Sequence, residues 1–197
     1  VSIVRKVLSR TQDMWSEHAL PRNPFGFATN FRGRAHRKAG DIEILTSKGF
    51  QYISATDVTK NANLVGHYKV LIGRLVPSNG ELDTNPADGY RVITDTRIIG
   101  PSQINTETYL DIGVFPTEAE ARNFDIYLRG KFARFLLRQA ISSLNVTRDC
   151  FRFVPNMDFT KTWTDHTLYD VFGLTASETE IIESTIRDAS KPGDPNE

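Results

Sequence analysis

Hydrophobic and polar positions alternate most regularly between residues 109 and 114, in the middle of the chain. Every second residue there is apolar: Leu110, Ile112 and Val114. This period of two predicts a β-strand, which Pro116 ends because proline has no N–H to donate to a neighbouring strand. A helix is predicted to begin directly afterwards, since Thr117 and Glu120 have the spacing of a capping box.

The helix after Thr117 is predicted to run for about seven turns, to residue 142, and to be buried on two sides. One apolar stripe recurs at three- and four-residue spacing: Ala121, Phe124, Leu128, Phe132, Phe135 and Leu136. A second stripe follows on another side: Ile126, Ala133, Leu137 and Ile141. A helix with two apolar faces has to be covered twice, so we expect the core to close around it.

Shorter patterns before and after this region predict the remaining elements. Helices are predicted at about residues 2–18, 57–66, 165–172 and 176–189, the last opened by a capping box of Thr175 and Glu178. Strands are predicted at residues 41–46, 50–54, 67–75, 91–99 and 151–154, the first two joined by a tight turn. Residues 76–90 have the composition of a polar loop, and residues 191–197 that of a disordered tail.

The order of these elements predicts an α+β fold, because helices and strands do not alternate steadily as they do in a doubly wound sheet. We expect a mixed or antiparallel sheet packed on one long central helix, with small helices at the C-terminal end. A length of 197 residues is enough for one well-buried core. The chain is therefore divided into a helix at residues 1–20, one domain at residues 21–190 and a tail at residues 191–197.

Composition narrows the classes of function. The chain has 24 lysines and arginines against 24 aspartates and glutamates, so nucleic-acid binding would need a local cluster of charge. The single cysteine, Cys150, excludes an internal disulfide and a cysteine-based zinc site, and it favours a reducing, cytoplasmic setting. No apolar run is long enough to span a membrane. The first residue is Val1 rather than methionine, which is expected either for a fragment of a longer protein or for a processed chain.

Motifs for catalysis are absent from the sequence. There is no glycine-rich nucleotide loop, no zinc-protease motif and no nucleophile elbow. The four histidines are scattered, so no catalytic residue and no metal ligand is predicted. The nearest approach to a nuclease set is Asp41 with Glu43 and Lys48, whose spacing across a hairpin turn is too short. A metal-dependent nuclease or other DNA-modifying unit remains an alternative.

One dense cluster of positive charge is the main candidate for a binding site. It consists of four cations within seven residues: Arg32, Arg34, Arg37 and Lys38. Arginine forms forked hydrogen bonds with phosphates and guanine edges, and the preceding Thr29 and Asn30 add groups that suit base edges. On the residues alone, a solvated turn and a DNA-binding loop are equally open. A second cluster of positive charge lies along the predicted long helix: Arg122, Arg129, Lys131 and Arg138.

A series of short motifs runs through the chain in a fixed order. Its members are TETYL (106–110), EARN (120–123), YLRGKFARFL (127–136), FVP (153–155) with DF (158–159), WTD (163–165), LY (168–169), GL (173–174) and EIIE (180–183). With PFG (24–26), TNF (29–31) and YKV (68–70), this series resembles the C-terminal region of adenine-specific DNA methyltransferases of bacterial restriction-modification systems. Some members of that family carry an endonuclease on the same polypeptide. Gly130 departs from the pattern, which has a threonine at that position.

The resemblance implies a target-recognition domain, which reads the sequence of double-stranded DNA and holds no cofactor itself. A covalently linked N-terminal domain outside this chain would bind S-adenosylmethionine and transfer the methyl group, with residues 1–20 as the connection. Most of the matching residues are apolar or cap-forming, so we expect them to hold the fold. A third hypothesis is a protein-interaction module that docks through its N-terminal helix, which would require an exposed apolar face: Ile3, Val4, Val7 and Leu8.

Overall fold

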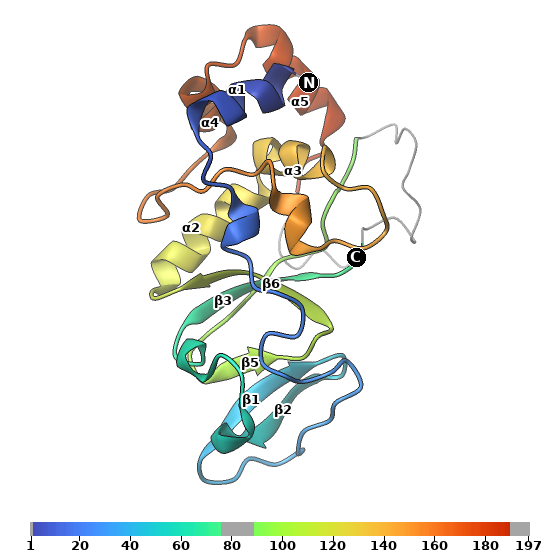
Figure 1. Ribbon diagram of the computed structural model, residues 1–197, viewed down its shortest axis with the longest axis vertical. Coiled ribbons are helices and arrows are strands. Elements are labelled where there is room, and N and C mark those ends of the chain that lie inside the picture. The colour runs from blue at the N-terminus through green and yellow to red at the C-terminus, as the bar shows by residue number, and fades with distance from the viewer. Residues whose placement is uncertain (1, 76–88, 190–197) are drawn as a thin grey trace.

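A computed structural model describes residues 2–75 and 89–189 of the chain (Figure 1). Within these residues there are five α-helices and six strands, in agreement with the predicted mixture of helix and sheet. One group of helices lies at one end of the long axis, further helices lie in the middle, and a small sheet forms the other end (Figure 1). The predicted tail and nearly all of the loop predicted at residues 76–90 lie outside the described residues.

The strands form two three-stranded sheets rather than one. The first has the order β2-β1-β5, in which β1 (Asp41–Thr46) is antiparallel to β2 (Gly49–Ser54) and parallel to β5 (Gln103–Asn105). In the second, β3 (Tyr68–Gly73) lies between β4 (Arg97–Ile99) and β6 (Tyr109–Phe115), antiparallel to both. The chain passes from β5 to β6 through a turn of only three residues, and this turn sends it from one sheet into the other.

Several local predictions are confirmed and others are wrong. The β1–β2 hairpin, the interior position of β3 and the end of β6 before Pro116 are as predicted. The strand predicted at residues 91–99 is shortened to β4, and Val92, with a φ of 75°, leaves the extended conformation near the predicted start. A φ of 48° at Asn61 likewise divides the helix predicted at residues 57–66 into two 3₁₀ turns, Ala55–Asp57 and Ala62–Leu64.

The long central helix is divided in two, which corrects the prediction. Helix α2 (Glu118–Arg129) begins at its predicted cap, Thr117, and ends at Gly130, whose ψ of 154° is extended. Helix α3 (Lys131–Arg138) then starts anew, and Asp165 supplies its cap from far along the chain. The two carboxylate oxygens of Asp165 accept the N–H groups of Lys131 (2.9 Å) and Phe132 (2.8 Å). A β-carbon on Gly130 would lie 2.7 Å from the Asp165 carboxylate, so glycine makes room for this cap.

The main core closes around α2 and α3. All six residues of the first predicted stripe are buried, whereas Ile126 of the second stripe is 48% exposed, so α2 is covered on one side and α3 on both. Trp15 is at the centre, stacked on Phe124 with 4.4 Å between the ring centroids. The backbone amide of Trp15 donates to the carbonyl oxygen of Val154 at 2.7 Å. The segment before Val154 forms a 3₁₀ turn, Arg148–Phe151, and not the strand predicted at residues 151–154.

The remaining helices are α1 (Ser2–Arg10), α4 (Asp165–Phe172) and α5 (Ala176–Thr185). Helix α1 is shorter than predicted, and its side chains Ile3 and Val7 are buried in the main core while Val4 and Leu8 are partly buried. Lys6 fixes the helix, since its ammonium contacts the Glu178 carboxylate at 2.6 Å and the Gly173 carbonyl at 2.8 Å. The apolar face on which a docking helix would depend is therefore covered by this chain itself.

A buried lysine joins the two sheets. Lys69 in β3 is fully buried, and its ammonium donates to three carbonyl oxygens: Val65 (3.1 Å), His67 (2.8 Å) and Gln103 (2.7 Å). Gln103 belongs to β5, so this one side chain connects the second sheet with the edge of the first. Three donors meet three acceptors, which satisfies a group that would otherwise be costly to bury.

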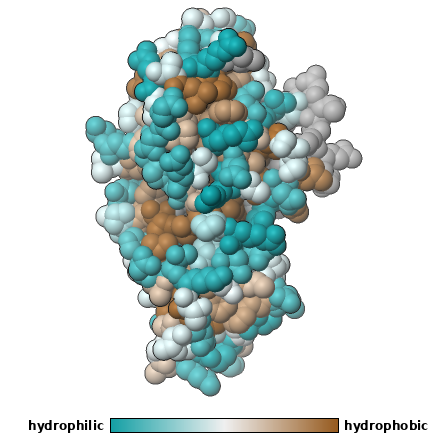
Figure 2. Space-filling view, in the orientation of Figure 1, coloured by the Kyte–Doolittle hydropathy of each residue, from teal (hydrophilic) through white to brown (hydrophobic). Residues whose placement is uncertain are grey.

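The surface is mostly polar on the face drawn in Figure 2, with apolar residues gathered in separate small patches. Among the described residues, none of the helices combines the length and the apolar character that crossing a membrane would require.

Candidate nucleic-acid interface

The predicted basic cluster lies along the outer edge of the sheet β2-β1-β5, which is called the small sheet from here on. Arg34 pairs with Tyr52 of β2 through two backbone hydrogen bonds of 2.8 and 2.9 Å, and the Gly33 amide donates to the Gln51 side chain at 2.8 Å. A β-carbon on Gly33 would lie 2.8 Å from the Tyr52 carbonyl oxygen, so only glycine permits this close approach without a shift. The loop is therefore laid against β2 at a defined register.

Asp41 at the start of β1 closes the loop from the inside. Its carboxylate pairs with the Arg34 guanidinium and accepts the Lys38 amide at 2.8 Å, while its own amide donates to the Lys38 carbonyl at 3.1 Å. Burial acts to raise the pKa of Asp41, but the Lys38 N–H and the Arg34 guanidinium outweigh it and hold that pKa below its ordinary value. The positive charge of Arg34 is thus largely compensated by the Asp41 carboxylate.

The other three cations of the cluster are exposed: Arg32, Arg37 and Lys38. Arg32 donates to the Phe31 carbonyl at 2.6 Å, and Arg37 makes one long contact of 3.4 Å with the Asp41 carbonyl. The Lys38 ammonium has no hydrogen bond or ion pair with any described residue. Among the described residues, no carboxylate forms a direct ion pair with these three side chains, although the nearby charge of Lys38 also helps to lower the pKa of Asp41. The cluster therefore leaves positive charge without a direct partner at the edge of the sheet.

The remaining predicted residues, Thr29 and Asn30, lie at the tip of a turn next to Arg32. The turn is closed by a hydrogen bond from the Phe31 amide to the Ala28 carbonyl at 3.0 Å. Phe27 anchors it in a second apolar cluster between the small sheet and the neighbouring loops, and Phe31 packs on Phe27 with ring centroids 4.6 Å apart. The packing of Phe27 and Phe31 therefore fixes the backbone from which the exposed side chains of Thr29 and Asn30 project.

Thr29, Asn30 and Arg32 line one shallow hollow together with residues from three other segments: Arg22, Ser47 and Glu107. The Glu107 carboxylate pairs with the Arg22 guanidinium and lies 3.4 Å from Arg74. The Glu107 amide also donates to the Phe27 carbonyl at 2.9 Å, which ties the turn before β6 to the aromatic anchor. Sequence reasoning missed Arg22 and Glu107, since 85 residues separate them and neither belongs to a charge cluster.

The basic residues of α2 and α3, which were predicted to lie on one long helix, contact partners within the fold. Arg122 pairs with Glu118, and Lys131 contacts Glu183 at 2.9 Å and Asp188 at 3.0 Å. The Arg138 guanidinium lies 3.5 Å above the centre of the Tyr90 ring. These contacts hold helices and neighbouring segments together, so this second cluster is less suited to binding phosphate than the loop.

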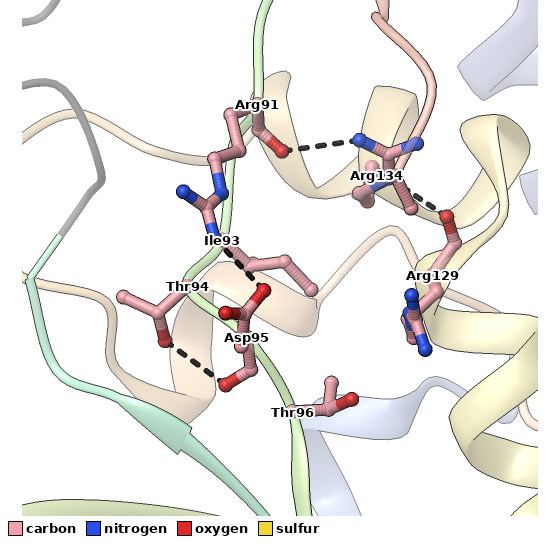
Figure 3. Close-up of a pocket in the computed structure, with 8 residues that line it drawn as sticks. Arg91, Ile93, Thr94, Asp95, Thr96, Arg129 and Arg134 are labelled. Carbon is pink, nitrogen blue, oxygen red and sulfur yellow. Dashed lines mark hydrogen bonds and ion pairs between the residues drawn. The ribbon is translucent and has the colours of Figure 1, made fainter. Parts of the chain in front are cut away.

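A second basic hollow lies between α2 and the segment at residues 91–96 (Figure 3). Its arginines are occupied: Arg91 pairs with Asp95 at 2.8 Å, and Arg134 is almost fully buried. The Arg134 guanidinium donates to four carbonyl oxygens, those of Arg129 (3.0 Å), Gly130 (3.2 Å), Arg91 (3.3 Å) and Arg187 (2.8 Å). Arg134 therefore connects three segments around the break between α2 and α3.

The residues considered for a nuclease are engaged in the sheet. Asp41 is bound by Arg34 and Lys38, and the Glu43 carboxylate accepts a hydrogen bond of 2.5 Å from Gln103 of the adjacent strand β5. Within residues 2–75 and 89–189, no three histidine, cysteine or acidic side chains are grouped so as to hold a metal ion. The two carboxylates of the set, Asp41 and Glu43, are therefore occupied by structural contacts.

Comparison of the chain with protein-family models, with curated proteins and with solved structures finds no match.

Proposed function

We propose that this chain is the DNA-reading part of a bacterial restriction-modification enzyme, an adenine-specific DNA methyltransferase that in some members of its class also cuts DNA. In this proposal the chain is not catalytic. A covalently linked N-terminal domain outside the chain binds S-adenosylmethionine and transfers the methyl group, and the whole enzyme acts in the cytoplasm. The motif series between residues 24 and 188 supports the class, and the edge of the small sheet supports the binding mode.

The observation that carries the proposal is a rigid edge with unpaired positive charge. Gly33 and Asp41 fix the backbone of the loop, while Arg32, Arg37 and Lys38 project from it with their charges unpaired. A protein of zero formal charge gains little long-range attraction to DNA, so a few clustered cations have to neutralise the phosphates. A fixed backbone lowers the entropy lost when such side chains bind.

The structure also changes the expected strength of this contact. Four free cations would give a slope of about −3.6 for log affinity against log salt, at about 0.9 for each phosphate contact. Arg34 is paired with Asp41, so three cations remain and the expected slope is about −2.7. Binding of the isolated chain is therefore expected to be weak and sensitive to salt.

The test is equilibrium binding of a fluorescent duplex from a randomised pool over a range of salt concentrations. Replacing Arg32, Arg37 and Lys38 together by alanine is expected to weaken binding to every duplex and to bring the slope close to zero. The matched control removes three exposed cations elsewhere, Arg5, Arg148 and Lys161, and should leave the slope nearly unchanged. Equal slopes for the wild type and the loop variant would show that the loop is only a solvated turn, and the proposed DNA face would be abandoned.

A further inference from the structure

The hollow beside the basic loop brings together several kinds of hydrogen-bonding group. Arg22 and Arg32 supply guanidinium donors, Asn30 supplies an amide, and Ser47 and Thr29 supply hydroxyl groups. Phosphate recognition needs only donors, whereas the edge of a base needs donors and acceptors in a defined order. This mixture is therefore better suited to a base edge than to a phosphate.

Arg22 is held by Glu107 in this hollow and still reaches solvent. Its Nε donates to the Oε1 atom of Glu107 and its Nη2 forms an ion pair with the same atom, and yet 71% of the side chain is exposed. Glu107 is itself only 13% exposed and lies between Arg22 and Arg74, so the acceptor is held from two sides. The guanidinium is thus fixed before any ligand arrives.

The geometry of the pair decides which edge of the guanidinium remains available. A guanidinium has five N–H groups, and Glu107 occupies the edge made of Nε and Nη2. The adjacent edge, made of Nη1 and Nη2, keeps two parallel N–H donors, one on each nitrogen. Two parallel donors match the O6 and N7 acceptors of guanine in the major groove, which is the commonest specific contact of arginine with DNA.

We infer that Arg22, oriented by Glu107, reads a guanine in the recognised DNA site. This inference rests on the proposed DNA-reading function and adds the base that one particular side chain recognises. Arg32, Arg37 and Lys38 then hold the phosphate backbone, while Arg22 contributes to the choice of sequence. Glu107 is a positioning residue, since it acts only through the guanidinium that it holds.

The test begins with selection of duplexes from a randomised pool by the 197-residue chain. The wild type is expected to select a site that contains at least one required guanine. Arg22→Lys keeps the charge but loses the fork, so it is expected to keep the salt slope while its preference for that guanine falls by about tenfold or more. Arg5→Lys, at an exposed arginine of α1, is the matched control and should select the same site as the wild type.

A chemical change in the DNA tests the same contact from the other side. Replacing the required guanine by 7-deazaguanine removes the N7 acceptor and is expected to weaken wild-type binding several-fold, with no further effect on Arg22→Lys. If Arg22→Lys selects the wild-type site with unchanged preference, or if no guanine is required, the inference is overturned while salt-dependent binding through the loop still stands. If the wild type binds no duplex at low salt, the proposed function itself fails.

Discussion

Replacing Asp165 by alanine is expected to destabilise the junction between α2 and α3. The two carboxylate oxygens accept the amides of Lys131 and Phe132, which are two of the donors that a helix leaves unpaired at its start. Loss of a capping side chain costs about 0.5–2 kcal/mol, and a hydrogen bond to a charged group contributes about 1.5–3 kcal/mol. We expect the free energy of unfolding to fall by about 2 kcal/mol.

The same junction gives a sharper test when Gly130 is replaced by threonine. Alone, this change places a β-carbon 2.7 Å from the Asp165 carboxylate, and the crowding is expected to cost about 1–3 kcal/mol. In the Asp165→Ala background the carboxylate is gone, and a threonine at this extended position can cap α3 with its own hydroxyl. The double variant should therefore lose less than the sum of the single losses, by about 1 kcal/mol or more.

Urea denaturation followed by tryptophan fluorescence, to which Trp15 and Trp163 both contribute, measures all four members of this cycle. Asp170→Ala is the matched control, because Asp170 is an exposed acid of the same helix α4, and it should change the free energy of unfolding by less than about 0.5 kcal/mol. Strictly additive losses for the two substitutions would refute the reasoning, since they would show that residues 130 and 165 do not share one cap.

Two further predictions concern the sheets. Burial raises the pKa of Asp111 from 3.8 to about 7, so its contribution to stability is fully present below pH 3.8 and is lost as pH rises through 7. The free energy of unfolding of Asp111→Asn, relative to that of the wild type, should therefore rise between pH 5 and pH 7 by on the order of 2 kcal/mol in denaturation experiments. A difference between the two proteins that does not change with pH would contradict this prediction. Gly33→Ala is expected to lift the basic loop from β2, with a loss of about 1–3 kcal/mol in stability and weaker DNA binding, because its β-carbon would lie 2.8 Å from a backbone oxygen. Gly66→Ala, whose β-carbon would meet no atom within 4 Å, is the control and should change neither quantity.

Features set by neighbouring residues could be predicted from the sequence. The capping boxes and glycine ends of the helices are examples: Thr175 with Glu178 opens α5, and Gly173 ends α4 in the left-handed conformation with a φ of 62°. The β1–β2 hairpin follows in the same way from a strand pattern on each side of a tight turn. Each of these depends on groups a few residues apart, which a single sequence displays directly.

Features set by distant residues could not be predicted. Helical periodicity continues through Gly130, and only the position of Asp165, 34 residues beyond Lys131, explains why one helix becomes two. The charge density of the loop was visible in the sequence, but the pairing of Arg34 with Asp41 was not. Arg22 and Glu107 meet only because the fold places the turn before β6 beside the turn after Pro21, so the hollow has no signal in sequence spacing.

The construction of the small sheet limits how its binding properties can be exchanged between proteins. Strand β1 has β2 on one side and β5 on the other, and β5 comes from residues 103–105, more than 40 residues later in the chain. A transplant of residues 21–60 alone would leave β1 without its parallel neighbour and Arg22 without Glu107. The proposed reading surface is therefore inherited as two separate segments that have to move together, and natural or engineered recombination with a single crossover on each side of the loop would break it.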